Sequence, residues 1–272
     1  MLHNDPMKII ETKEEREKEL NYFFKDNQEL LQRLKRLDDK KCEIKKLKSE
    51  YGPLEEPIVI TISGTPRAGK TTCIENLYEF LKKADLKTAC MEEPAGLVYQ
   101  TLQNKEEKKR LLQDRIGFVE KQYEIGSHQI NQAIINNDIV LCDRGMLDTF
   151  IWYNMYYKLG MMDEQRYIEF IQKMENVSTY KNIFYMLYAN NEQSMLRDYL
   201  SSLSIEQRTT MNRQNVERYN EAMLDLTSTF NKYVDNKLID TSNIGKMDAS
   251  ILIADEVLKL VESQYVKKKS RR

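Results

Sequence analysis

IVITISGTPRAGKTT, residues 58–72, is the stretch that decides the fold of this chain. Its first five residues, Ile58 to Ile62, are rich in β-branched side chains and predict a short buried strand. The residues from Gly64 to Thr71 then fit the pattern G-x-x-x-x-G-K-[ST] at every fixed position. An amphipathic helix is predicted directly afterwards, since apolar residues follow at helical spacing: Ile74, Leu77, Tyr78 and Leu81. A strand, this loop and a helix in that order predict a phosphate-binding P-loop.

The residue types of this loop explain how it would bind a polyphosphate. Glycines at 64 and 69 let the backbone turn so that successive N–H groups point inward, and the helix adds its positive end. Lys70 supplies a mobile charge for the outer phosphates, and the Thr71 hydroxyl can ligate Mg²⁺. We therefore expect nucleotide to be bound by Gly64, Thr65, Pro66, Arg67, Ala68, Gly69, Lys70, Thr71 and Thr72.

Arg67 is not required by the P-loop pattern. A guanidinium inside the loop could reach the transferring phosphoryl group, which makes Arg67 a catalytic candidate, and a solvated loop arginine is the equally open alternative. The run from Arg67 to Thr72 resembles the P-loop of eukaryotic-type thymidylate kinases, which also carry an arginine there. The resemblance implies a kinase rather than a GTPase or a motor.

The composition of the 272 residues gives no sign of a membrane or a nucleic-acid partner. Charged residues make up 31% of the chain, and the net charge is -1. No apolar run approaches the roughly 18 residues of a membrane span, and the polar N-terminus does not resemble a signal peptide. The four cysteines have no metal-type spacing, so we expect reduced thiols in a cytoplasmic protein.

Residues 1–56 differ in composition from the remainder of the chain and predict a helical extension. Lys, Glu and Leu dominate, and no glycine or proline occurs between positions 11 and 50. Phe23, Leu30, Leu37 and Ile44 recur every seven residues, but polar residues interrupt the second seam of a coiled coil. We expect a long helix or hairpin that packs by one stripe on the core or on a second subunit, which would give a homodimer. A kinase-like domain would then cover residues 57–266, and residues 267–272 would form a frayed basic tail.

Strand and helix patterns alternate through this kinase-like domain. Further strands are predicted over 87–92, 138–142, 182–187 and 238–240, and helices over 106–136, 147–158, 163–176, 213–233 and 247–263. This alternation predicts an α/β fold, a three-layer parallel sheet of about five strands with helices on both faces. Ligands bind such sheets at the carboxyl ends of the strands, so residues 64–71, 92–96, 143–145 and 241–246 should surround one cleft.

Asp143, Arg144 and Gly145 close the hydrophobic strand at 138–142. An acid at this place can hold the hydration shell of Mg²⁺, and Arg144 can bind a phosphate through two hydrogen bonds. A turn capped by aspartate is the alternative. The context resembles the Asp-Arg motif of thymidylate kinases and the corresponding Glu-Arg motif of deoxynucleoside kinases.

Glu93 stands before Pro94 at the end of the strand predicted over 87–92. In the same two families a Glu-Pro at this point lines the acceptor site. If the acceptor is a hydroxyl, Glu93 could take its proton, and if it is a phosphate, Glu93 would instead bind the sugar. A strand-ending acid without a chemical role is the alternative.

Several further side chains are site candidates by position. Arg197, Arg208 and Arg213 lie where nucleotide kinases keep a lid of arginines, although three arginines could equally form a solvated helix face. Similar kinases hold the acceptor with an arginine, an aromatic residue and a glutamine on one helix face, which here are Arg115, Phe118 and Gln122, although Phe118 could simply be core. Residues 241–243 correspond to a backbone cradle for adenine, and Trp152 belongs to an aromatic cluster that could pack or wall a base pocket.

The resemblance to nucleoside and nucleotide kinases covers about residues 57 to 263. It implies an ATP- and Mg²⁺-dependent transfer of the γ-phosphoryl group to a nucleoside, a nucleotide or a similar small acceptor. One departure concerns the acceptor, because the sequence lacks the arginine that precedes Glu-Pro in thymidylate kinases. Two alternatives remain open: a regulatory NTPase that changes partner contacts through the N-terminal helices, and a kinase of nucleic-acid ends, for which only the basic tail speaks.

Overall fold

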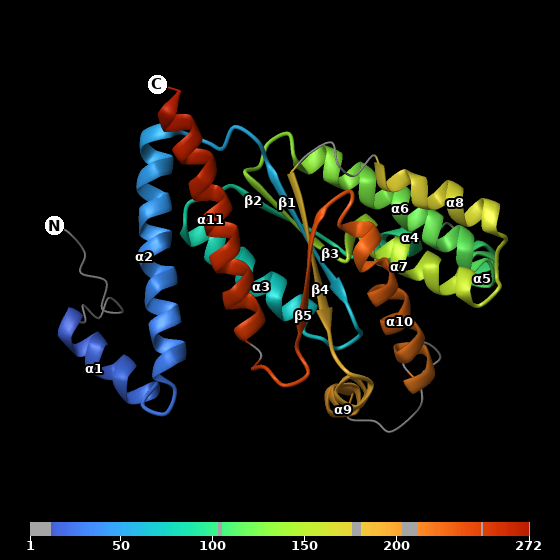
Figure 1. Cartoon of the computed structure of the whole chain (residues 1–272), viewed down its shortest axis with the longest axis horizontal. Coiled ribbons are helices and arrows are strands. Elements are labelled where there is room, and N and C mark those ends of the chain that lie inside the picture. The colour runs from blue at the N-terminus through green and yellow to red at the C-terminus, as the bar shows by residue number, and fades with distance from the viewer. Residues whose placement is uncertain (1–11, 103–104, 176–180, 203–211, 246, 272) are drawn as a thin grey trace.

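The computed structural model describes residues 12–102, 105–175, 181–202, 212–245 and 247–271. Five strands form one sheet in the order β2-β3-β1-β4-β5, and every neighbouring pair is parallel (Figure 1). The predicted parallel α/β fold is therefore confirmed. The strands are β1 (Ile58–Gly64), β2 (Thr88–Met91), β3 (Ile139–Asp143), β4 (Lys181–Tyr188) and β5 (Asp235–Asp240).

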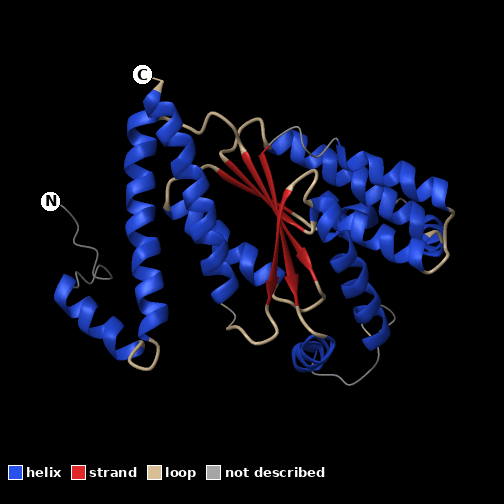
Figure 2. Ribbon diagram, in the orientation of Figure 1, coloured by secondary structure: helices blue, strands red, loops and turns tan. Residues whose placement is uncertain are grey.

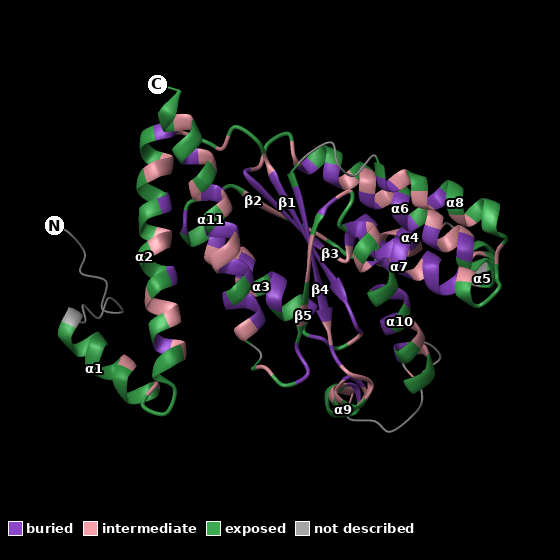
Figure 3. Ribbon diagram, in the orientation of Figure 1, coloured by how far each residue is buried: buried purple, intermediate pink, exposed green. Residues whose placement is uncertain are grey.

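Both faces of the sheet are covered by helices, as Figure 2 shows. Along β1, Ile60 belongs to a core cluster on one face, and Val59 belongs to a cluster on the other. Figure 3 shows the central strands β1, β3 and β4 and the inward sides of the helices as buried, whereas β2 and β5 at the edges are partly exposed. The first face carries α2 (Gln28–Tyr51), α3 (Lys70–Lys83) and α11 (Asp248–Ser270), and the second carries α6 (Arg115–Ala133), α7 (Gly145–Lys158), α8 (Glu164–Gln172) and α10 (Arg213–Phe230).

Within the kinase-like domain, the helices first differ from the sequence prediction in three places. A helix at Pro94–Thr101 (α4) was not predicted, although proline is favoured in a first helical turn. The single helix predicted over 106–136 is divided at Asp114, which caps α6 by accepting from the Gly117 N–H, and α5 (Lys105–Gln113) precedes it. The arginine-bearing stretch after β4, for which no helix bounds were predicted, contains α9 (Asn191–Ser202), which lies at the carboxyl end of β4 (Figure 1).

The N-terminal extension forms α1 (Lys13–Phe23) and α2. The heptad pattern is wrong at Phe23, which ends α1 and is 68% exposed, because Asn27 caps a new helix that begins at Gln28. Within α2, Leu37 and Ile44 are buried in the same core cluster as the sheet, and α2 packs along α11. The apolar stripe of α2 thus contacts the core, and dimerisation through these helices stays a prediction.

Helix α11 also runs further than predicted, to Ser270, where the sequence suggested a frayed tail. Lys268 Nζ donates to the Pro53 carbonyl at 2.9 Å, and Arg271 pairs with Glu55 at 2.7 Å. Basic residues near a helix C-terminus also interact favourably with the helix dipole. Over the described residues, no helix is both long and apolar enough to cross a membrane, and all four cysteines are free thiols.

Asp138 joins three segments at the amino end of the sheet. Its buried carboxylate accepts from Lys48 Nζ at 2.8 Å, from the Leu54 N–H at 3.0 Å and from the Lys87 N–H at 2.8 Å. Burial by itself raises the pKa of this carboxyl, but these hydrogen bonds outweigh burial and hold the pKa below its ordinary value. The pair of Lys48 and Asp138 therefore connects α2 with the loops before β1 and β2.

We expect Asp138→Ala to lower the free energy of unfolding by about 3–5 kcal/mol, because it leaves Lys48 and two backbone N–H groups without their acceptor. Lys48→Met should cost less, since the carboxylate keeps both backbone donors. The pKa is lower in the folded chain, so the stabilisation is present above the unfolded pKa and is lost as the pH falls through the folded pKa. Urea unfolding from pH 3 to 7 measures both effects, and equal acid sensitivity of Asp138→Ala and the unmodified chain would contradict this account.

Candidate active site

The turn between β1 and α3 requires its glycines. Gly64 has φ +129°, and a Cβ there would lie 2.0 Å from the Leu187 carbonyl oxygen of the neighbouring strand. Gly69 has φ +95° and precedes the first residue of α3. Below the turn, Thr65 Oγ1 donates to Asn220 at 2.6 Å and accepts from the Ala189 N–H at 3.0 Å. We call the turn from Gly64 to Thr71 the phosphate cradle. Through Thr65 it is held by Asn220 of α10 and by the backbone that follows β4.

Lys70 is buried in the phosphate cradle. Its Nζ donates to the carbonyl oxygens of Gly64 at 3.0 Å and Thr65 at 2.8 Å. Burial, and then the nearby charge of Arg144, lowers the pKa of the Lys70 ammonium to about 7. The two carbonyl oxygens replace only part of the hydration that the ammonium loses on burial. A bound anion would therefore be attracted to Lys70 and would favour its fully protonated, charged form.

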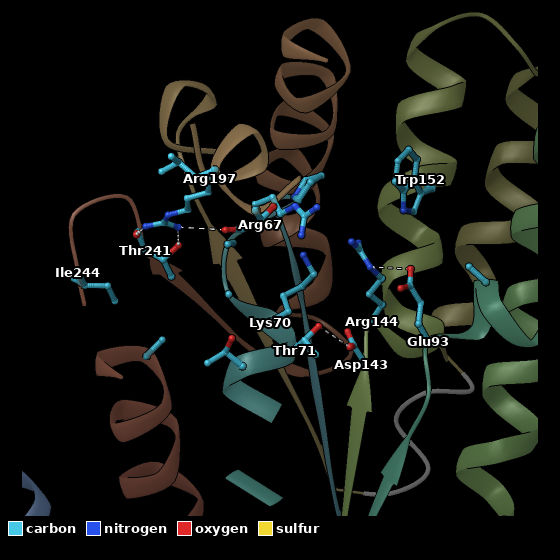
Figure 4. Close-up of a pocket in the computed structure, with 18 of the residues that line it drawn as sticks. Arg67, Lys70, Thr71, Glu93, Asp143, Arg144, Trp152, Arg197, Thr241 and Ile244 are labelled. Carbon is cyan, nitrogen blue, oxygen red and sulfur yellow. Dashed lines mark hydrogen bonds and ion pairs between the residues drawn. The ribbon is translucent and has the colours of Figure 1, made fainter. Parts of the chain in front are cut away.

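Thr71 and Asp143 meet at the carboxyl edge of the sheet. Thr71 Oγ1 donates to Asp143 Oδ2 at 3.2 Å, so a hydroxyl at the start of α3 touches a carboxylate at the end of β3 (Figure 4). Mg²⁺ prefers oxygen ligands and usually takes only one or two protein groups beside phosphate and water. These two residues therefore fit a magnesium ion, even though the described residues hold no group of three or more His, Cys, Asp or Glu that could bind a metal.

Arg144 lies between two carboxylates beside this point. Its Nε is 2.9 Å from Glu93 Oε1, and its Nη1 is 3.5 Å from Asp148 Oδ2. Burial disfavours the charge of the guanidinium, but Asp148 and Glu93 raise its pKa above the ordinary value. Within the part of the chain that the structure describes, Arg144 Nη1 is buried without a hydrogen-bond partner. A buried donor of this kind is suited to a ligand oxygen.

Asp148 is a site residue that the sequence did not reveal. It is 2% exposed and accepts from Tyr219 Oη at 2.6 Å, from Trp152 Nε1 at 2.9 Å and from the Ser63 hydroxyl. Residues on β1, α7 and α10 thus share one carboxylate. Arg144 lies one helical turn away, so this network places a fixed negative charge beside the guanidinium.

These groups open on one cleft of about 880 Å³. Figure 4 shows Glu93 and Trp152 at one end, Arg197, Thr241 and Ile244 at the other, and Lys70, Thr71 and Asp143 between them. At the first end, the rings of Tyr99 and Phe118 also line the cleft, with centroids 5.1 Å apart. At the second end, Arg197 Nη2 donates to the Thr241 carbonyl at 2.6 Å.

The structure brings most of the predicted site residues to this cleft, but not all of them. The cleft is lined by Pro66, Arg67, Ala68, Gly69, Lys70, Thr71, Thr72, Glu93, Phe118, Asp143, Arg144, Arg197 and Thr241. Gly64 and Thr65 lie at the base of the phosphate cradle. Gln122 is buried within α6, Arg115 is exposed at the start of α6, and Arg213 is exposed at the start of α10. Arg208 lies outside the described residues.

Comparisons with known proteins place the chain in a family and support its fold. A family model described as an AAA domain matches residues 59–231, which is more than half of the chain. Among solved structures, deoxyadenosine kinase from M. mycoides with the products dCMP and a flexible dCDP aligns at a TM-score of 0.55 and 19% identity, covering 74% of this chain and 98% of that one. The same enzyme with dATP gives a TM-score of 0.54 at 18% identity, covering 74% and 99%. No curated protein matches the sequence. At these identities the structural similarity shows the fold.

Proposed function

The chain belongs to the AAA domain family, and on that premise we propose that it is a P-loop kinase which transfers the γ-phosphoryl group of ATP to a hydroxyl of a nucleoside or a similar small acceptor. One observation carries this proposal. The phosphate cradle, the Thr71–Asp143 pair and the Glu93–Arg144 pair open on the same cleft, with aromatic rings beyond them. A P-loop that only hydrolyses nucleotide would not need an aromatic chamber at its γ-phosphate end.

The donor would occupy the cleft from Thr241 to the phosphate cradle. Lys70 and the backbone N–H groups of the cradle would hold its phosphates. Thr71 and Asp143 would hold Mg²⁺, which when bound neutralises phosphate charge. The backbone of residues 241–245 and the Arg197 guanidinium would contact the adenine, since Thr241, Ile244, Gly245 and Arg197 line that end of the cleft.

The acceptor would lie among Glu93, Phe118 and Trp152. Among the described residues that line this end of the cleft, Arg144 is the cation, and two carboxylates already contact it. A phosphorylated acceptor would therefore meet nearly balanced charge rather than an excess of positive charge. This favours an uncharged hydroxyl acceptor with a flat base that stacks on the aromatic rings. We keep Arg115 and Gln122 as proposed contacts to the outer part of that acceptor.

Phosphoryl transfer then needs one proton movement. The Glu93 carboxylate takes the proton of the acceptor hydroxyl, whose oxygen forms the new bond to the γ-phosphorus. The bond from that phosphorus to the β–γ bridging oxygen breaks, and ADP leaves. Lys70, Arg144 and Arg67 stabilise the charge on the transferring group, and the proposed lid arginines Arg208 and Arg213 would close over it.

A regulatory role is the second candidate, and one contact favours it. Arg33 of α2 pairs with Asp248 at 3.1 Å, and the other oxygen of that carboxylate accepts from the Gly245 N–H at 2.8 Å. Because Gly245 lines the cleft, the N-terminal extension is linked to the proposed adenine loop. A regulatory NTPase would use this link to change partner contacts with the bound nucleotide.

Incubation with γ-labelled ATP and Mg²⁺ in the presence of nucleosides, nucleoside monophosphates or oligonucleotides distinguishes these functions. We expect label on at least one nucleoside and complete loss of transfer when EDTA removes the metal. Transfer only to monophosphates would overturn the hydroxyl acceptor and leave the kinase. Slow hydrolysis without transfer would select the regulatory NTPase, and label on oligonucleotide ends would select a nucleic-acid kinase.

A further inference from the structure

One face of helix α9 contacts the phosphate cradle through hydrogen bonds. Ser194, Arg197 and Asp198 are spaced so that all three point to the same side of the helix. Ser194 Oγ donates to the Pro66 carbonyl at 2.7 Å, and Arg197 Nη1 donates to the Arg67 carbonyl at 3.4 Å (Figure 4). The third residue, Asp198, contacts the Arg67 side chain.

The contact between Asp198 and Arg67 uses one edge of the guanidinium. Arg67 Nε donates to Asp198 Oδ1 at 2.8 Å. The Asp198 side chain is 4% exposed, whereas that of Arg67 is 38% exposed and lines the cleft. A buried carboxylate needs a charged partner, and Arg67 is the cation that pairs with it. Among the described residues, Nε is the side-chain donor of Arg67 that makes a hydrogen bond, which leaves the two terminal amino groups to donate to a ligand.

The backbone of Arg67 indicates that this arrangement is imposed by its surroundings. Arg67 has φ +60°, a left-handed conformation that is unfavourable for a residue other than glycine. Such conformations persist where neighbouring contacts over-determine them, and they gather at functional sites. Here α9 contacts the carbonyl that precedes Arg67, the carbonyl of Arg67 and the Arg67 side chain.

We propose that Asp198 is the positioning residue for Arg67: by holding Nε, it directs both terminal amino groups of Arg67 toward the terminal phosphate of ATP. This inference rests on the proposed function. Asp198 does not itself touch the nucleotide. Its charge also balances that of Arg67, so the cradle gains directed hydrogen bonds without a large excess of positive charge.

The test compares Arg67→Met, Asp198→Asn and the double variant, with Glu192→Gln as the control because Glu192 is an exposed acid on the same helix. We expect Asp198→Asn to lower kcat by about 10–10²-fold through misplacement of the guanidinium, and Glu192→Gln to leave it unchanged. The preference for ATP over ADP, measured as a ratio of Kd values, should fall about tenfold in each single variant, while the Kd of ADP stays constant. The double variant should be no worse than Arg67→Met, because both changes remove the same interaction.

Each failure has a separate meaning. An additive double variant, or an Asp198→Asn chain with unchanged kcat and unchanged ATP preference, would overturn the positioning role and leave the kinase. Weaker ADP binding together with a lower Tm in both Asp198→Asn and Asp198→Ala would show a structural role and likewise overturn it. A chain that binds ATP but transfers no phosphoryl group refutes the proposed kinase, while the ATP preference still decides about Asp198. Absence of ATP binding refutes both.

Discussion

Lys70→Met is expected to lower kcat/KM for phosphoryl transfer by about 10³-fold or more. The ammonium lies inside the phosphate cradle and would be the nearest mobile charge to the group in transfer. Methionine has a similar length and fills the buried space, so the loss would not come from a cavity. We expect the affinity for ATP to fall by less than the rate, since the backbone N–H groups of the cradle remain.

The same change should stabilise the fold. Burial lowers the pKa of Lys70 to about 7, below the value of about 10.4 for an exposed lysine. The unfolded chain therefore binds more protons at this residue between those values, so stability rises with pH from about 7 to about 10. Lys70→Met removes that dependence and the cost of burying the charge.

Transfer assays with labelled ATP and urea unfolding at pH 7 and 9 measure both effects. Lys83→Met is the matched control, because Lys83 ends the same helix in an exposed position. If Lys70→Met retained transfer within threefold of the unmodified rate, the phosphate cradle would not stabilise the phosphoryl group in transfer, and this prediction would be wrong.

The centre of this site could be predicted from sequence because its chemistry is local. The strand, loop and first turn of α3 lie within fifteen residues, and each glycine there has a backbone reason to be glycine. The rule that parallel strands end at one edge then brought in the distant Asp143, which contacts Thr71. The sheet itself could be predicted because β1, β3 and β4 are almost fully buried and therefore read as continuous apolar runs.

The residues that the sequence missed are those whose partners come from other elements. Asp148 is a single acid in the apolar run GMLDTFIWY, and its donors come from β1 and α10 as well as from its own helix. A carboxylate isolated among apolar residues was the available signal, since such a group must find donors. Asp198 was hidden because α9 was not predicted, although no glycine or proline interrupts residues 191–202.

Helical spacing placed three residues at the acceptor end of the site, and the structure brings only one of them to the cleft. Arg115, Phe118 and Gln122 do lie three and four residues apart, but only Phe118 lines the cleft. Spacing gives the face of a helix, whereas the elements that cover each turn along that face are set by tertiary packing. At Gln122 the face is buried, and at Arg115 it is exposed.

Glu93→Gln is expected to lower kcat by about 10²–10⁴-fold, the usual contribution of a general base, while the Kd of ATP stays within a few-fold. Glutamine keeps the shape of the side chain and an oxygen for Arg144 Nε, but it cannot take the proton of an acceptor hydroxyl. Glu92→Gln is the matched control, because Glu92 is adjacent and exposed and does not line the cleft.

The pH dependence of the rate tests the role of Glu93 more directly than the size of the rate loss in Glu93→Gln does. Burial raises the pKa of this carboxyl, and although the Arg144 guanidinium lowers it, the pKa stays above the ordinary value. The rate should therefore fall with decreasing pH over a range above the ordinary pKa of glutamate, as the base is protonated, and Glu93→Gln should lose this acidic limb. A phosphate acceptor would not need a base, so a loss below tenfold with the acidic limb unchanged would contradict a hydroxyl acceptor. Since Arg144 contacts the same carboxylate, the base is held beside the cation that would neutralise the transferring group. The Glu93–Arg144 pair would therefore place proton removal from the acceptor and charge neutralisation of the phosphoryl group next to each other.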